Sequence, residues 1–143
     1  MPNIRWLIAL FTVLHRFVYL VTDGRIGAAG LGRKFLLLRH VGRKSGREYV
    51  VPLLCVEDAG RFVVVGSNGG DVRNPAWWLN LEARPQARIQ YRRERREVLA
   101  RNALGEERER LWARCLATYP FYDRYEGRAG REIPVVVLDP RVA

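Results

Sequence analysis

Apolar residues follow one period at the start of the chain and another in the rest of it. In residues 4–21, which are mostly apolar, the polar positions from Arg5 to Tyr19 recur at spacings of seven, four and three, so they share one face of a helix. Further along, short runs rich in valine and leucine are separated by glycine-containing turns, which is typical of strands. The pattern predicts an amphipathic helix with a glycine-rich linker in residues 1–32, followed by a β-rich domain in residues 33–143.

Six segments of the second part predict strands, and the short turns between successive strands indicate antiparallel neighbours. The tightest turn is Asp58-Ala59-Gly60, and Asn74-Pro75 is typical of a helix start, with Asn as the N-cap and Pro in the first helical position. Six mostly antiparallel strands with three peripheral helices predict an α+β fold, mainly β, shaped as a small barrel or a strongly curved sheet. The strands are expected at residues 35–41, 48–57, 61–67, 87–93, 96–103 and 133–138, and two further helices from Asn74 to the helix breaker Pro85 and at residues 106–119.

The N-terminal helix can have one of three partners. A spanning helix needs about 20 apolar residues, and Arg16 beside His15 interrupts the run, so residues 4–21 are not expected to cross a membrane. No small-residue cleavage site follows, which argues against a signal peptide. The wide apolar face is expected to pack on the core, to form a homodimer interface or to lie on the inner membrane surface, and the net charge of +10 favours the membrane.

Composition and residue spacing limit the kinds of ligand and catalytic site that the chain is expected to have. A net charge of +10 attracts anions such as nucleic acid, acidic lipid headgroups or a polyanionic cofactor. Cys55 and Cys115 show no CxxC spacing, and His15 and His40 lie in different elements, so no disulfide framework and no metal site are expected, and a reducing cytoplasm is the simplest location. No Ser-His-Asp set, carboxylate pair or activated thiol emerges, and the chemistry of an enzyme would reside in a cofactor.

Two glycine-rich loops are candidate anion sites. The GRKSG loop at residues 42–46 offers backbone N–H groups, a guanidinium on Arg43, an ammonium on Lys44 and a hydroxyl on Ser45, although its spacing is not that of a Walker A loop. The GSNGG loop at residues 66–70 leads into a helix N-terminus, where N–H groups favour negative charge. Taken alone, each loop is more simply interpreted as a surface turn, but two such loops on successive strand ends favour anion binding.

Aromatic residues supply candidates for a planar ligand and its acceptor. Trp77 and Trp78 open the internal helix, where both fit the core and one of them could cover a planar ligand. Tyr119, Tyr122 and Tyr125 lie in the segment YPFYDRY, which is expected to be a loop after the last helix. These tyrosines either plug the end of the barrel or line a substrate pocket.

Together, the ordered motifs GRKSG, VVPL, GSNGG, NPAWWLNLEARP, YPFYDRY and IPVVVL resemble the deazaflavin-dependent nitroreductase family, the F420H2-dependent quinone reductases of actinobacteria. The likeness covers roughly residues 33–140. It implies a split β-barrel shared with FMN-binding flavoproteins, the cofactor F420, and hydride transfer to a quinone-like or nitroaromatic acceptor. The amphipathic N-terminus also looks like that of members reported as membrane-associated.

The resemblance implies roles for individual residues. Arg43, Lys44 and Ser45 match the loop that holds the cofactor phosphate. The YPFYDRY cluster itself, in the absence of a better proton donor, makes Tyr122 our first choice for a hydrogen-bond donor to the acceptor oxygen. Two departures stand out, because Asn68 replaces a lysine common in the family and Val51 replaces an asparagine of some members. The remaining cofactor contacts would be Tyr49, Val50, Val51, Pro52, Ser67, Asn68, Gly69, Gly70, Ala76 and Trp77, and the substrate pocket would be bordered by Tyr119, Tyr122 and Tyr125.

Two alternatives remain. A split barrel can bind FMN or heme instead, and the chromophore that binds would distinguish these cases. A basic nucleic-acid-binding barrel would show affinity that falls steeply with salt, with aromatic residues interleaved among arginines. The run YRRERR at residues 91–96 contains one aromatic residue, and a solvated strand face explains it, so no nucleic-acid partner is expected.

Overall fold

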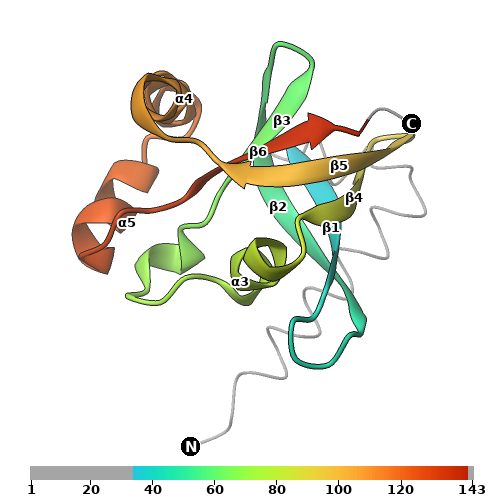
Figure 1. Ribbon diagram of the computed structural model, residues 1–143. Coiled ribbons are helices and arrows are strands. Elements are labelled where there is room, and N and C mark those ends of the chain that lie inside the picture. The colour runs from blue at the N-terminus through green and yellow to red at the C-terminus, as the bar shows by residue number, and fades with distance from the viewer. Residues whose placement is uncertain (1–33, 142–143) are drawn as a thin grey trace, which may run out of the picture.

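Six antiparallel strands close into a barrel in the computed structural model, which describes residues 34–141 (Figure 1). The strands are β1 (Phe35–Val41), β2 (Glu48–Asp58), β3 (Arg61–Val65), β4 (Gln86–Tyr91), β5 (Glu94–Asn102) and β6 (Val135–Pro140). Neighbours follow the order β1-β2-β3-β6-β5-β4, and β4 pairs with β1 to close the ring. The expectation of a mainly β barrel with antiparallel strands is confirmed.

Helices cover the barrel from outside. Within residues 34–141 they are α3 (Ala76–Ala83), α4 (Gly105–Thr118) and α5 (Tyr122–Ala129), together with the 3-10 helix η2 (Asn68–Gly70). Figure 1 shows α4 and α5 together on one side and α3 apart from them. No helix in this part of the chain is long and apolar enough to cross a membrane. The expected helix at residues 4–21 and its linker lie outside the described residues, so the division into residues 1–32 and 33–143 stays a prediction.

One face of each strand fills the interior of the barrel. Leu38 on β1 pairs with Val51 on β2 and with Ile89 on β4, so these three side chains point to the same side. Trp77 and Trp78 of α3 belong to the same core cluster, and each is 6% exposed. Because α3 inserts both rings into this cluster, it is anchored to the barrel and carries the residues at its N-terminus into a fixed position.

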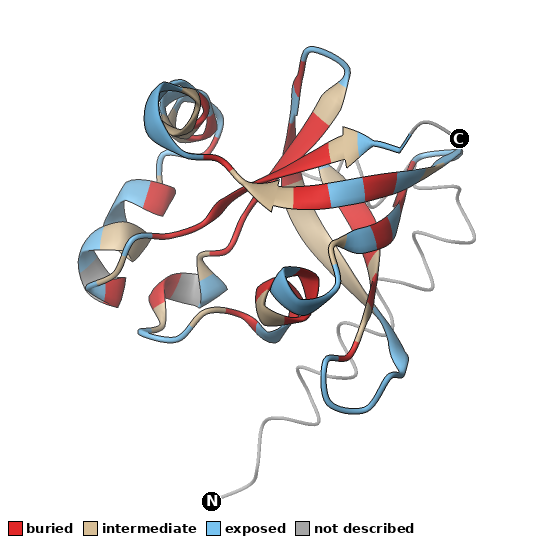
Figure 2. Ribbon diagram, viewed as in Figure 1, coloured by how far each residue is buried: buried red, intermediate tan, exposed pale blue. Residues whose placement is uncertain are grey.

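A second cluster lies between the outer faces of β3 and β6 and the helices. Val63 pairs with Val137, and both pack in a cluster with Leu111 and Cys115 of α4. Figure 2 shows β6 buried along most of its length, whereas buried and exposed residues alternate on β5. The nearly continuous apolar sequence of β6 follows from burial on both of its faces.

The hairpin between β4 and β5 turns earlier than predicted. Tyr91 pairs with Glu94, which leaves Arg92 and Arg93 as the turn, and Arg92 has a φ of 55°. The Tyr91 ring is buried against Phe62, with ring centroids 4.9 Å apart. This packing fixes Tyr91 as the last strand residue, and no glycine or asparagine in the sequence marks the turn.

Two expectations about helices were wrong. Asn74 does not cap α3, because Pro75 occupies the N-cap position and the Asn74 side-chain oxygen accepts a hydrogen bond from Arg131 at 2.7 Å. The YPFYDRY segment is not wholly a loop, since most of it forms the start of α5. Asp123 in the first turn and Gly130 as a left-handed C-cap, with a φ of 64°, are the signals in the sequence that indicate this helix.

Candidate functional site

Two neighbouring hollows of about 510 and 450 Å³ share lining residues and so form one groove. We call the first the cation end and the second the aromatic end. The shared residues are Val51, Asn68, Pro75 and Trp77. The cation end is further lined by His40, Gly42, Arg43, Lys44, Ser45, Tyr49, Val50, Ala76 and Asn80, and the aromatic end by Phe35, Pro52, Leu53, Leu54, Val65, Ser67, Phe121, Tyr122 and Tyr125.

The GRKSG loop forms the cation end by folding tightly on itself. The Gly42 N–H donates to the Arg47 carbonyl at 2.7 Å, and the Gly46 N–H donates to the Gly42 carbonyl at 2.9 Å. A Cβ on Gly42 would lie 2.6 Å from Ser45 Oγ and 2.8 Å from a Tyr49 ring carbon, so only glycine fits there. The loop therefore presents its exposed basic side chains from a compact turn.

Asn80 of α3 holds this loop in place through hydrogen bonds from Arg43. Its Oδ1 accepts hydrogen bonds from the Arg43 backbone N–H at 3.1 Å and from Arg43 Nη1 at 2.8 Å. Its Nδ2 lies 3.0 Å from Nδ1 of His40, and burial lowers the pKa of His40 below its ordinary value. Sequence reasoning missed Asn80, and the available signal was a lone amide in the otherwise apolar run AWWLNL.

An apolar wall runs along the middle of the groove. Val51 from β2 and Trp77 from α3 line both ends, and Val50 and Ala76 line the cation end. Pro52 lines the aromatic end. The structure thus brings together the two segments that the sequence assigned to the cofactor ring. Trp78 packs in the core cluster and does not line either hollow, which settles which of the two tryptophans faces the groove.

The loop that leads from β3 to α3 is held by Arg131, which sequence reasoning also missed. Its guanidinium donates to the carbonyls of Gly66, Ser67, Asp71 and Arg73 at 3.1–3.2 Å, in addition to Asn74. These bonds fix the backbone on both sides of η2, where Asn68 has a φ of 49° and lines both ends of the groove. Ser67 lines the aromatic end, and the Gly70 N–H closes the turn that contains Gly69 by donating to the Ser67 carbonyl.

The three candidate tyrosines divide into two groups. Tyr122 and Tyr125 line the aromatic end of the groove, whereas Tyr119 lines neither hollow. The Tyr119 hydroxyl accepts from the Lys34 N–H at 3.0 Å and donates to the Cys55 carbonyl at 3.1 Å. Tyr122 is 4% exposed, and burial raises the pKa of its phenol. Its hydroxyl makes no hydrogen bond within residues 34–141, so it can serve a ligand.

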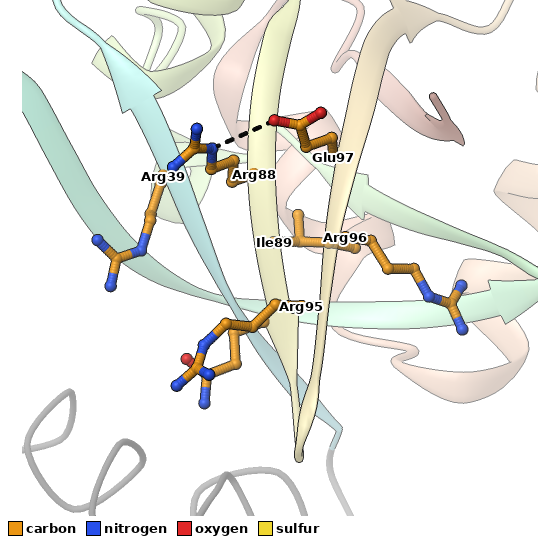
Figure 3. A pocket seen from close by; sticks show the side chains of 7 residues that line it. Arg39, Arg88, Ile89, Arg95, Arg96 and Glu97 are labelled. Carbon is orange, nitrogen blue, oxygen red and sulfur yellow. Dashed lines mark ion pairs between the residues drawn. The ribbon is translucent and has the colours of Figure 1, made fainter. Parts of the chain in front are cut away.

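A third hollow, of about 330 Å³, lies on the outer face of β1, β4 and β5 (Figure 3). Four arginines line it, but Arg39 pairs with Glu48 at 3.1 Å and Arg88 pairs with Glu97 at 3.6 Å. Figure 3 shows Arg96 pointing away from the others. No aromatic side chain of the described residues lines this hollow, so it lacks a surface for stacking bases.

Neither cysteine is an activated nucleophile. Both are 1% exposed, and burial raises the pKa of Cys55 to about 12 and that of Cys115 to about 11. Each therefore remains a thiol at neutral pH. Within residues 34–141, no three His, Cys, Asp or Glu residues lie close enough together to hold a metal ion.

Comparison with known proteins identifies the family. The model of the F420H(2)-dependent quinone reductase family matches residues 13–140. The chain belongs to this family. A Mycobacterium tuberculosis protein with the provisional name of F420H(2)-dependent quinone reductase is 42% identical over 106 residues, which are 74% of this chain and 89% of that protein. The resemblance inferred from the motifs is confirmed, and the chain is an oxidoreductase whose cofactor is F420.

Solved structures agree on the fold. An F420-H2 dependent reductase, FDR-A, is 36% identical with a TM-score of 0.68, over 73% of this chain and 93% of its own. A chain described as a domain-swapped dimer is 33% identical with a TM-score of 0.71, over 89% and 96% of the two chains. HutZ, a heme storage protein from Vibrio cholerae, is 20% identical with a TM-score of 0.53, over 78% and 84%, and shares the fold alone. The barrel is therefore a split β-barrel, as expected.

Proposed function

We propose that the groove binds reduced F420 with the cofactor phosphate at the cation end, and that a hydride passes to a quinone-like or nitroaromatic acceptor at the aromatic end. One observation carries this proposal: a single groove is basic at one end and apolar and aromatic at the other. A ligand that is anionic at one end and planar at the other fits such a groove.

The residues present fit this cofactor. At the cation end, Arg43, Lys44 and the Ser45 hydroxyl would hold the phosphate, since all three are exposed on one tight loop. Along the middle, Val51 and Trp77 would border the ring, because aliphatic and aromatic surfaces suit a planar conjugated system. The lysine common at the position of Asn68 is absent, so the phosphate depends on the GRKSG loop.

The protein's own contribution is orientation, exclusion of water and one hydrogen bond. Reduced F420 supplies the hydride when it is bound. Burial of the groove floor, where Tyr122 is 4% and Val65 is 8% exposed, limits the access of water to the acceptor. The Tyr122 hydroxyl would donate to the acceptor oxygen as it gains charge, and because its pKa is raised it stays protonated at neutral pH.

A binding titration tests the cofactor assignment. The purified full-length protein is titrated with F420, FMN and heme while tryptophan fluorescence is followed, because Trp77 lines the groove. We expect F420 to quench the fluorescence preferentially, and we expect this quenching to be reduced in Trp77→Phe and retained in Trp112→Phe. In a separate assay, the F420H2-loaded enzyme should reduce menadione and a nitroaromatic. Preference for FMN or heme would contradict the proposal.

The segment at residues 4–21, for which the sequence predicts an amphipathic helix, would bring the enzyme to membrane-bound quinones. We propose that this segment attaches the protein to anionic membrane surfaces. The full chain should co-sediment with vesicles that contain phosphatidylglycerol and only weakly with neutral vesicles. Deletion of residues 1–21 should abolish binding to the phosphatidylglycerol vesicles. Unchanged vesicle binding after the deletion would exclude this role.

We also propose that the chain forms a homodimer. The likeness to a domain-swapped dimer supports this assembly. Analytical ultracentrifugation of the full chain, and of the chain that lacks residues 1–21, would give its mass and show whether the N-terminal segment is needed. A monomer at micromolar concentration in both cases would exclude the dimer.

A further inference from the structure

The side chain of Asn80 joins the anion loop to the helix beside the ring site. It accepts two hydrogen bonds from Arg43 and lies within hydrogen-bond distance of His40. Asn80 is 4% and His40 is 6% exposed, so the contact between these two side chains is shielded from water. Because Asn80 belongs to α3, which also carries Trp77, the network ties the two halves of the groove together.

Only one arrangement of protons satisfies this network. The Asn80 nitrogen can only donate, so Nδ1 of His40 must accept, and the proton of the neutral ring must lie on Nε2. Turning the amide over would place its NH2 group against two N–H donors of Arg43. The network therefore requires neutral His40 in the Nε2–H form.

We propose that His40 and Asn80 are positioning residues for the GRKSG loop, and that protonation of His40 releases Arg43 and weakens the binding of the cofactor phosphate. A protonated His40 would present an N–H at Nδ1 to the NH2 group of Asn80, and two donors cannot share that contact. The inference rests on the proposed function, because it assigns a pH response to the same site.

The surroundings of His40 set the pH at which this release occurs. Tyr49 of β2 stacks on its ring with centroids 5.8 Å apart, and Arg43 and Lys44 of the loop line the same hollow. The lining residues from α3 are uncharged, and no residue of β4 lines this hollow. Since no carboxylate of residues 34–141 lines this hollow and burial lowers the pKa of His40 below 6.5, the network is intact at neutral pH and is lost in acid.

The sign of the effect distinguishes this mechanism from simple charge attraction. Protonation of His40 adds a positive charge beside an anion site, which by itself would strengthen phosphate binding as the pH falls. Release of the loop predicts the opposite, because the Arg43 guanidinium is no longer held by Asn80. Weaker binding in acid can therefore not be produced by electrostatic attraction alone.

Calorimetric titration of the full-length protein with F420, from about pH 8 to about pH 5 at constant ionic strength, tests the proposal. We expect the Kd to rise about tenfold in acid, the value of one charge-assisted hydrogen bond.

Two variants test the roles of the network residues. His40→Asn keeps an acceptor at the δ position without titrating, so its Kd for F420 should lose the pH dependence. Asn80→Leu should bind F420 weakly at every pH. Asn102→Leu removes an amide on β5 outside the groove and should behave as wild type. A constant or falling Kd in acid, or a pH response that survives in His40→Asn, would overturn the proposal.

A second readout needs no cofactor. Nitrogen-15 NMR of the imidazole rings should show His40 as the Nε2–H tautomer at neutral pH, with His15→Gln used to assign the two histidines. As His40 titrates, the Arg43 amide should lose its protection from hydrogen exchange. If F420 binds at neutral pH but His40 shows the other tautomer, this inference fails and the proposed function stands. If the tautomer and the amide behave as expected but F420 does not bind, the proposed function fails instead.

Discussion

At the cation end of the groove the functional groups are exposed side chains on one short hairpin loop, whereas at the aromatic end they are buried and come from distant parts of the chain. Arg43 and Lys44 are neighbours in sequence, both are exposed, and both line the hollow. Trp77 and Tyr122 belong to two helices and to the two core clusters of the barrel. The same ligand would therefore meet two environments within one groove.

Because of this difference, substitutions at the cation end should change ligand affinity alone, whereas substitutions at the aromatic end should also change protein stability. A residue of the loop can change without disturbing the core, so the cation end can be tuned for binding alone. At the aromatic end Trp77 and Tyr122 would border the ligand and they also fill the core, so a substitution there should change stability and function together. Three variants test this separation, from the largest expected effect to the smallest.

Trp77→Ala should cost the most, about 3–5 kcal/mol of unfolding free energy, because it removes a ring that is 6% exposed and leaves a cavity. F420 affinity should fall in the same variant. Chemical denaturation monitored by circular dichroism gives the first quantity. Trp112→Ala is the control, since Trp112 is half-buried on α4 and lines neither end of the groove; it should cost less and leave F420 binding intact. Equal costs for the two substitutions would contradict the dual role of Trp77.

Removing both loop cations should act on binding alone. For Arg43→Ala with Lys44→Ala we expect the Kd for F420 to rise about 100-fold, roughly tenfold for each charge-assisted contact, with a shallower dependence on salt. The unfolding midpoint should move little, because both side chains are exposed and Asn80 keeps its hydrogen bond from the backbone N–H of residue 43. Arg47→Ala is the matched control on the same loop, since Arg47 does not line the groove. A large loss of stability in the double variant would break the comparison.

The two ends also differ in how far the sequence predicts them. Strand periodicity and glycine turns are local signals, and for that reason the barrel and the position of the GRKSG loop between β1 and β2 were predicted correctly. The bond between His40 and Asn80 joins residues 40 positions apart, and the contacts of Arg131 join residues 57–65 positions apart. No local pattern encodes such contacts, because they depend on how α3 and α5 dock on the closed barrel. The short helix α5 was also missed, because it contains Gly127 and spans eight residues.

Tyr122→Phe should produce the smallest effect and the most specific one. Loss of one hydrogen bond to the acceptor, worth about 1 kcal/mol, should lower kcat for menadione by about fivefold with little change in KM. Tyr119→Phe is the matched control: its hydroxyl bonds the backbone of Lys34 and Cys55, so this substitution should lower stability and leave kcat unchanged.

The pH profile sharpens this last test. Burial raises the pKa of Tyr122 above its ordinary value of about 10, so the wild-type phenol remains a donor and kcat should not fall between about pH 7 and about pH 10 on account of this group. Equal quinone reduction by wild type and Tyr122→Phe would remove the proposed donor. The aromatic end would then act only through orientation and the exclusion of water, and its tyrosines would matter as packing residues.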